Sequence, residues 1–241
     1  MTEPKHRSFV VVDVENSRGR HNRELEAMRA ALYRIVDETI SYPEAVVAKE
    51  DRGDGFLVIL DLPVLDVLDH FAGGFLAGVR QHNFAVDPPD WLRVRIAVHE
   101  GYVNQDEHGW SSDALNATFG LNDSPMVKKT LELAARATGV IVVSDVVYQG
   151  VVRHNYRPTV TSTEYRSTMI GTKDGDVRIW VRAPGYSQPP FPDSSSEGAG
   201  APGKKAAARV DGLDAVTANT VVMGDLQSDT FVGRDYYGGS V

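Results

Sequence analysis

The chain of 241 residues contains no cysteine, and this absence excludes several classes of protein. A disulfide scaffold, a thiolate zinc finger, an iron–sulfur site and a cysteine nucleophile all need thiol groups. Long apolar runs are missing too, because no stretch approaches the roughly 18 uninterrupted apolar residues of a transmembrane helix. The N-terminal segment has no apolar run longer than FVVV. We therefore expect no signal peptide, no membrane partner and a cytoplasmic protein.

Positive charge is also scarce, since 25 basic residues stand against 33 acidic ones and give a net charge of −8. Nonspecific binding of nucleic acid depends on excess positive charge, so we expect no nucleic-acid partner. An acidic chain can still bind a nucleotide where metal ions lie between its carboxylates and the phosphates. The apolar fraction of 42% is sufficient for a globular core.

The composition changes sharply near residue 185. Residues 185–203 read GYSQPPFPDSSSEGAGAPG, and a segment so rich in Pro, Gly and Ser is typical of a linker. We expect residues 1–184 to form one domain and residues 185–241 to form a flexible tail. A small hairpin or a partner-dependent strand is predicted near residues 219–237, which leaves open a protein partner for the tail.

Strand-like and helix-like segments alternate through residues 1–184. Residues 8–14 are an apolar, β-branched run typical of a buried strand, and residues 23–40 carry apolar side chains at helical spacing. The predicted strands cover residues 8–14, 45–49, 55–60, 93–99, 140–143, 165–168 and 177–182. The predicted helices cover residues 23–40, 61–82, 113–121 and 127–137. This order predicts an α+β fold with helices packed on a mixed sheet.

Two aspartates interrupt otherwise apolar or turn-like segments. Asp13 ends a buried strand, where a carboxylate is costly unless a cation satisfies it. Asp54 lies in the Gly-Asp-Gly tip of the predicted hairpin, and an ordinary turn is the simpler interpretation of that position alone. If the strand of Asp13 lies beside the hairpin, the two carboxylates meet at one edge of the sheet. Such a pair of hard oxygen ligands suits Mg²⁺ or Mn²⁺ carrying a nucleoside triphosphate.

The ordered motifs resemble the catalytic domain of class III adenylate/guanylate cyclases, in particular a divergent actinobacterial branch with an EDRGDG signature. The resemblance covers about residues 8–182 and follows the segments VVVDVENS, EDRGDGFLVIL, RVRIAVHEGYV, DEHGWSSDALNATFGL and VIVVSDVVYQGVV. It implies a ferredoxin-like cyclase fold that works as a homodimer with active sites at the subunit interface. It also implies a signalling enzyme that converts a nucleoside triphosphate into a 3′,5′-cyclic nucleotide and pyrophosphate.

The resemblance assigns roles to individual residues. Asp13 and Asp54 match the two metal-binding aspartates, which implies two Mg²⁺ or Mn²⁺ ions per site. Asn116 matches the asparagine that orients the ribose from the partner subunit. The turn whose backbone amides hold the triphosphate is matched by Val14, Glu15, Asn16 and Ser17.

One family position is altered. Four residues after Asn116, the family has an arginine that stabilises charge on the α-phosphate, and this chain has Gly120. The loss of such a cation typically costs roughly a thousandfold in rate. The candidates for a cation that takes the place of this arginine are Arg18, Arg20, Lys128 and Lys173. Lys173 is favoured as a catalytic residue because some relatives have a phosphate-binding lysine near that place.

Base selection is the least constrained property. Glu50 stands four residues before Asp54, where adenylate cyclases have a lysine and guanylate cyclases a glutamate. A carboxylate accepts hydrogen bonds from guanine but repels the acceptor N1 of adenine, so ATP is disfavoured. Arg52 could pair with a carbonyl-rich pyrimidine edge. The superfamily includes relatives that make cyclic UMP or cyclic CMP in antiphage signalling, so UTP or CTP and a role in antiviral defence stay open.

The predicted strand at residues 93–99 contains two arginines and a histidine. Arg93 and Arg95 alternate along one strand and are predicted to lie on a solvated face, while His99 is assigned to packing or hydrogen bonding.

The alternative to an active enzyme is a catalytically degenerate cyclase-like domain, favoured by Gly120, that binds a nucleotide or a protein partner and uses its tail to recruit an effector.

Overall fold

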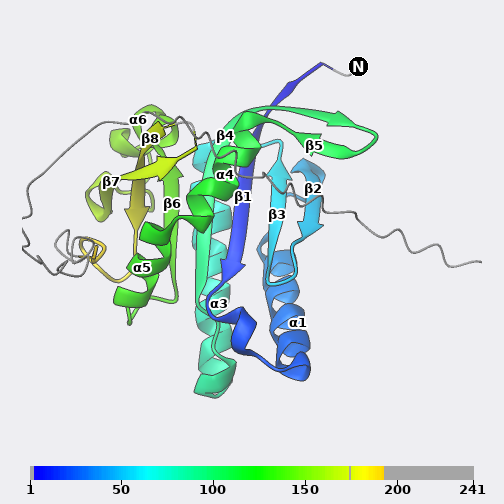
Figure 1. Ribbon diagram of the computed structural model, residues 1–241, viewed down its shortest axis with the longest axis vertical. Helices are drawn as coiled ribbons and strands as arrows, with labels where there is room; N and C mark the ends of the chain where they lie inside the picture. Colours follow the sequence, from blue (N-terminus) through cyan, green and yellow to red (C-terminus); the bar gives the residue numbers. More distant parts are fainter. Residues whose placement is uncertain (1–2, 174, 193–241) are drawn as a thin grey trace, which may run out of the picture. The chain divides into compact units, whose positions relative to one another are not determined.

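The computed structural model describes residues 3–173 and 175–192 (Figure 1). The chain beyond residue 192, including the hairpin predicted near residues 219–237, lies outside the described residues. No helix in the described part of the chain is both long and apolar enough to cross a bilayer.

Within the described residues, eight strands form one mixed sheet. Seven of them follow the order β2-β3-β1-β4-β6-β8-β7, and β5 pairs with β4. Neighbouring strands are antiparallel except for β4 and β6, which are parallel. The strands are β1 Lys5–Val14, β2 Val46–Asp51, β3 Gly55–Leu60, β4 Val94–Asp106, β5 Gly109–Ser111, β6 Gly139–Ser144, β7 Tyr165–Thr172 and β8 Gly175–Arg182.

Helices cover both faces of this sheet, which confirms the predicted α+β architecture. The α-helices are α1 Asn22–Thr39, α2 Val64–Asp66, α3 Gly73–Ala85, α4 Asp113–Asp123, α5 Pro125–Leu133 and α6 Asp145–Gly150. A π-helical segment, Val67–Ala72, joins α2 to α3. Side chains of α1 and α3 pack on one face of the sheet, and those of α4 and α5 pack on the other. β5 and α6 are elements that the sequence pattern did not predict.

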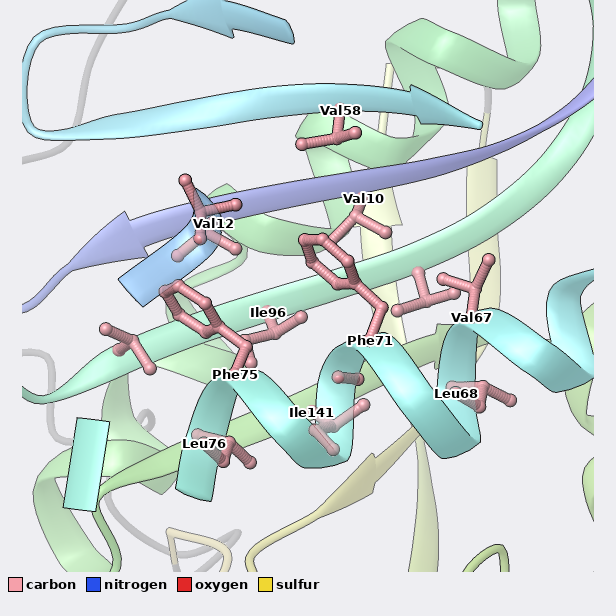
Figure 2. Close-up of a cluster of buried hydrophobic side chains, with 14 of the residues drawn as sticks. Val10, Val12, Val58, Val67, Leu68, Phe71, Phe75, Leu76, Ile96 and Ile141 are labelled. Atoms are coloured by element: carbon pink, nitrogen blue, oxygen red, sulfur yellow. The ribbon is translucent and has the colours of Figure 1, made fainter. Parts of the chain in front are cut away.

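β1 is central because it is buried on both faces. Figure 2 shows Phe71 and Phe75 pointing onto Val10 and Val12 of β1. Phe9 and Val11 alternate with these valines and belong to the core under α4 and α5. Period-2 alternation therefore places Asp13, two residues after Val11, on the face that α4 and α5 cover.

The first residues of the predicted linker lie against the domain. Tyr186 and Phe191 pack on the core under α4 and α5. The Tyr186 hydroxyl accepts a hydrogen bond from the Arg136 amide at 3.2 Å, and the Arg166 guanidinium lies 4.4 Å from the centre of the Phe191 ring. The domain boundary at residue 184 stays a prediction, and the chain from 185 to 192 continues along the surface of the same unit.

His99 on β4 ties the middle of the sheet to α6. Its Nδ1 lies 2.7 Å from the Ser144 hydroxyl, and Ser144 caps α6 by accepting a hydrogen bond from the Val147 amide. Burial lowers the pKa of His99 from its usual 6.5 to about 4, and nearby His6 adds to that effect. The imidazole is therefore neutral at physiological pH and serves as a hydrogen-bonding group.

This burial predicts an acid-sensitive fold. Between about pH 4 and 6.5 the unfolded chain binds a proton at His99 that the folded chain does not, so the free energy of unfolding falls on acidification. The slope from this one group is at most about 1.4 kcal/mol per pH unit. In urea unfolding at pH 7, 6 and 5, His99→Gln should lose less stability on acidification than the wild type. A substitution of the exposed His154 by Gln is the control, and an equally flattened slope there would contradict the assignment to His99.

Candidate functional site

The end of β1 and the turn before β3 bring two aspartates together. Asp13 lies opposite Gly55 in the antiparallel β1–β3 pair, and the Val14 amide donates a 3.0 Å hydrogen bond to the Asp54 carbonyl. Gly53 holds the turn with a φ of +86°, a conformation that a side chain disfavours. At Gly55 a Cβ atom would lie 2.0 Å from the Val12 carbonyl oxygen. Both glycines are therefore required by the geometry that brings Asp54 to Asp13.

A cavity of about 550 Å³ opens at this edge of the sheet, and we refer to it as the first cavity. Its volume lies within the range of small-molecule sites. Seven of the residues that the sequence predicted for the metal and substrate site line it, namely Asp13, Val14, Glu15, Asn16, Ser17, Arg52 and Asp54. The structure therefore brings together most of the predicted site within one chain.

The turn after β1 is held in a defined conformation. Asn16 adopts a left-handed conformation with a φ of 57°, and the Ser17 hydroxyl donates a 2.5 Å hydrogen bond to the Asp54 carboxylate. The Val14 and Glu15 amides donate to the carbonyls of Asp54 and Arg93. Within the part of the chain that the structure describes, the amides of Asn16 and Ser17 donate to no backbone carbonyl, so these two members of the predicted phosphate-binding turn keep their amides for a ligand.

Arg95 overturns the prediction of a solvated strand face. It lies directly opposite Asp13 in the β1–β4 pair, is only 7% exposed, and forms an ion pair with the Asp13 carboxylate. Burial lowers the pKa of the Arg95 guanidinium, while the charge of Asp123 opposes that shift. The prediction was wrong because α4 and α5 cover this face of β4, so the alternating arginines point into protein and not into water.

Arg93 is the second arginine of this pattern, and it fastens the turn to α5. Its guanidinium donates to the Glu15 carboxylate at 2.6 Å and to the carbonyls of Leu131 and Ala134 at 2.5 and 3.1 Å. These carbonyls lie at the C-terminal end of α5, where a cation is favourable. Burial raises the pKa of the Glu15 carboxyl, against the opposing charge of Arg93. Arg93 thus joins β4, α5 and the turn after β1.

A second cavity, of about 690 Å³, holds the remaining predicted catalytic residues. Asn116, Gly120 and Lys173 all line it. Helix α4 is the wall between the two cavities, because its residues Phe119 and Asn122 line the first cavity and Asn116 and Gly120 line the second. Asn116 and Lys173 therefore line one cavity together, and Asp13 and Asp54 line the other.

Glu50 and Arg52 form an ion pair at the edge of the first cavity. Arg52 donates to the Glu50 carboxylate at 2.9 Å, and its guanidinium lies 4.7 Å from the centre of the Phe119 ring. Arg52 lines the first cavity, whereas Glu50 is absent from the described residues that line either cavity. The two residues predicted to read the base are thus in mutual contact, with Arg52 facing the cavity.

The donor set suits a metal ion that arrives with its ligand. Among the described residues, no group of three or more histidine, aspartate or glutamate side chains is arranged to hold an ion. Mg²⁺ usually binds proteins through one or two carboxylates together with substrate phosphates and water. Asp13 and Asp54, which line one cavity beside the turn, fit that requirement. The Arg95 cation already pairs with Asp13, so an ion that binds there competes with this arginine.

Sequence reasoning missed several residues of the first cavity. Phe119, Asn122 and Asp123 recur at helical spacing on one face of α4, so their common face could have been read from the pattern. Arg95 is flanked by apolar residues on both sides, Val94 and Ile96, which is typical of a strand buried on both faces. Lys128 was considered only as a replacement cation, and the structure places it in the first cavity.

Comparison with solved structures supports a cyclase-like fold. A crystal structure of an adenylate/guanylate cyclase/hydrolase from Silicibacter pomeroyi matches with a TM-score of 0.52 and 19% sequence identity, over 76% of this chain and 98% of that one. The catalytic core of a rhodopsin-guanylyl cyclase with converted specificity, in complex with ATPαS, matches with a TM-score of 0.50 and 18% identity, over 76% of this chain and 99% of that one. The chain is thus structurally similar to class III adenylate/guanylate cyclase catalytic domains.

Sequence comparisons add nothing to this likeness. No protein-family model matches the chain. No curated protein matches it either.

The close approach at Gly55 predicts a severe effect of one methyl group. In Gly55→Ala the new Cβ would press on the Val12 carbonyl, so β1 and β3 must separate beside Asp13. We expect a loss of about 3 kcal/mol in the free energy of unfolding, measured by urea denaturation. The control is Gly150→Ala, because a Cβ at Gly150 meets nothing within 4 Å. An unchanged stability of Gly55→Ala would show that the strands do not approach this closely.

Proposed function

We propose that this protein is a nucleotide cyclase, which converts a nucleoside triphosphate into a 3′,5′-cyclic nucleotide and pyrophosphate at the interface of a homodimer. The observation that carries the proposal is the convergence of Asp13, Asp54 and the turn at Asn16 and Ser17 in one cavity, on a fold similar to that of cyclase catalytic domains. A sheet edge with two carboxylates beside a tight turn can bind a metal-complexed triphosphate.

The reaction needs no nucleophilic side chain. The ribose 3′-oxygen attacks the α-phosphorus, the bond from that phosphorus to the bridging oxygen breaks, and pyrophosphate leaves while the hydroxyl proton passes to solvent. Bound Mg²⁺ or Mn²⁺, held by Asp13 and Asp54, would lower the pKa of the 3′-hydroxyl and neutralise the pyrophosphate. The chain itself contributes the amides of Asn16 and Ser17 and three of the cations that line the first cavity, Arg18, Arg95 and Lys128.

The separation of the two cavities supports a shared site. Asn116 and Lys173 line a different cavity from Asp13 and Asp54, so one chain does not bring all four residues to one ligand. A homodimer in which the second cavity of one subunit faces the first cavity of the other would join them. In that arrangement Asn116 orients the ribose, and each dimer contains two equivalent sites.

Gly120 stands where the family has its transition-state arginine, so this position bears on whether the domain is catalytically active or degenerate. The space beside it is open, with nothing within 4 Å of a Cβ placed there, and Lys173 lines the same cavity. Lys173 is therefore our candidate for the cation that the family's arginine would supply. The second candidate function is a cyclase-like domain that binds a nucleotide or a protein partner without turnover. It is favoured by Gly120 together with the Asp13–Arg95 ion pair, which places a cation where a metal ligand is needed.

The Glu50–Arg52 pair narrows the choice of base without fixing it. Glu50 accepts hydrogen bonds from ring N–H groups and Arg52 donates to carbonyl oxygens, so the pair complements guanine or uracil better than adenine. We therefore place GTP and UTP ahead of ATP as substrates. CTP comes after them, because cytosine offers Arg52 a carbonyl oxygen but offers Glu50 no ring N–H group.

The direct test supplies each of the four ribonucleoside triphosphates with Mn²⁺ and detects cyclic product by mass spectrometry. We expect product from at least one of them, and Asp54→Asn should lower the rate by about 100-fold or more, because an amide is a poor ligand for the ion. Asp90→Asn is the matched control, since Asp90 is exposed and outside both cavities. Binding of nucleotide without product from any of the four would favour the degenerate alternative.

A mixing experiment tests the shared site. Asp54→Ala damages the first cavity and Asn116→Ala the second, so each homodimer alone should be inactive. In an equal mixture half of the dimers are heterodimers with one intact site, and we expect about a quarter of the wild-type rate. A mixture as inactive as its components, at concentrations where dimers are present by light scattering, would count against a site built from two chains.

A further inference from the structure

Asn122 is a polar residue in a place where an apolar one would pack. It lies in the last turn of α4 and is only 3% exposed. Its neighbour Leu121 is buried in the core under α4 and α5. Asn122 nevertheless lines the first cavity, whereas Asn116 of the same helix lines the second. The site that holds Asp13 and Asp54 therefore receives a buried side-chain amide from its own chain.

The oxygen of this amide is buried without a hydrogen-bond partner among the described residues. An unpartnered buried acceptor lowers stability, so its presence calls for a physical reason. The same helix satisfies its other buried polar side chain, because the Thr118 hydroxyl donates to the Ala114 carbonyl at 2.8 Å. The buried Thr118 hydroxyl of α4 thus has a hydrogen-bond partner, whereas the Asn122 amide oxygen at the first cavity has none.

Other orphan atoms lie around the same cavity. Arg95 Nε and Glu15 Oε1 are likewise buried and have no partner within the described part of the chain, and both residues line the first cavity. These groups belong to three different elements, β4, the turn after β1 and α4. Three of the six unpartnered buried side-chain atoms of the described residues thus belong to residues that line this cavity, which supports a polar ligand there.

We propose that Asn122 binds the nucleotide in this cavity by accepting a hydrogen bond from a ribose hydroxyl. The inference rests on the proposed function, in which a nucleoside triphosphate occupies the first cavity. An acceptor oxygen needs a donor, and ionised phosphate oxygens offer none. The ring N–H groups of the base are assigned above to Glu50, which leaves the ribose hydroxyls as the donors for Asn122. The phosphates instead meet the cations Arg18, Arg95 and Lys128, which line the same cavity. Asn122 thereby acts within its own chain, in addition to Asn116.

The test compares two probes on the Mn²⁺-loaded full-length protein by calorimetry. One probe is a non-cyclisable α,β-methylene nucleoside triphosphate, taken with whichever base binds the wild type most tightly. The other is inorganic tripolyphosphate, which lacks the ribose. We expect Asn122→Leu to weaken binding of the nucleotide analogue by about three- to tenfold, the equivalent of one hydrogen bond, and to leave tripolyphosphate unchanged. Thr118→Val, a buried substitution on the same helix that faces neither cavity, should change neither affinity.

The ratio of the two affinities separates a ligand contact from a folding defect. A damaged cavity weakens both probes together, and Asn122→Ala serves as a second variant should the leucine not fit. Equal weakening of both probes, or no change in either, would overturn the assignment of Asn122 alone. A wild-type protein that binds tripolyphosphate but none of the nucleotides would overturn the proposed function as well.

Discussion

The close approach of β1 and β3 at Gly55 is the constraint on which the candidate site depends. The strands meet so tightly that the Val12 carbonyl occupies the space a side chain would need, and the next residues on each side are Asp13 and Asp54. Two carboxylates in a folded protein repel each other and require a cation for compensation. Here the backbone fixes their proximity first, and Arg95 on the adjacent strand provides the compensating charge.

That charge balance explains the arrangement of the rest of the cavity. An arginine buried to 93% would be strongly destabilising without its carboxylate partner. Asp123 on α4 adds a second negative charge that favours the protonated guanidinium. The cavity is therefore close to electroneutral before any ligand binds. A ligand that breaks the ion pairs of this cavity must give each charged side chain a new partner of opposite charge. A metal–triphosphate complex carries both signs of charge and can do so, which favours its binding over that of the metal ion or the triphosphate alone.

The sequence was sufficient to predict the fold, and seven of the residues that it proposed for a site line one cavity. Apolar alternation and helical spacing predicted the mixed sheet and its covering helices, and the Gly-Asp-Gly turn identified Asp54 because its glycines have a backbone reason to be there. The strand pattern alone did not reveal that Arg95 is buried or that Arg93 is bonded to the end of α5, because alternating charge predicts a wet face unless a helix elsewhere in the chain covers it. The division of α4 between two cavities likewise depends on how that helix packs, and no local pattern reports it.

The bonds of Arg93 have a consequence for local stability. Its guanidinium joins the Glu15 side chain to carbonyls at the end of α5, and its own carbonyl accepts from the Glu15 amide. The turn after β1 cannot open without breaking hydrogen bonds that also hold the C-terminal end of α5. The end of α5 likewise cannot open without breaking bonds that hold this turn. The two segments are about 116 residues apart in the chain, yet these shared bonds lead us to expect that they open as one cooperative unit. The turn after β1 thus has the local stability of a helix terminus and not that of an ordinary surface loop.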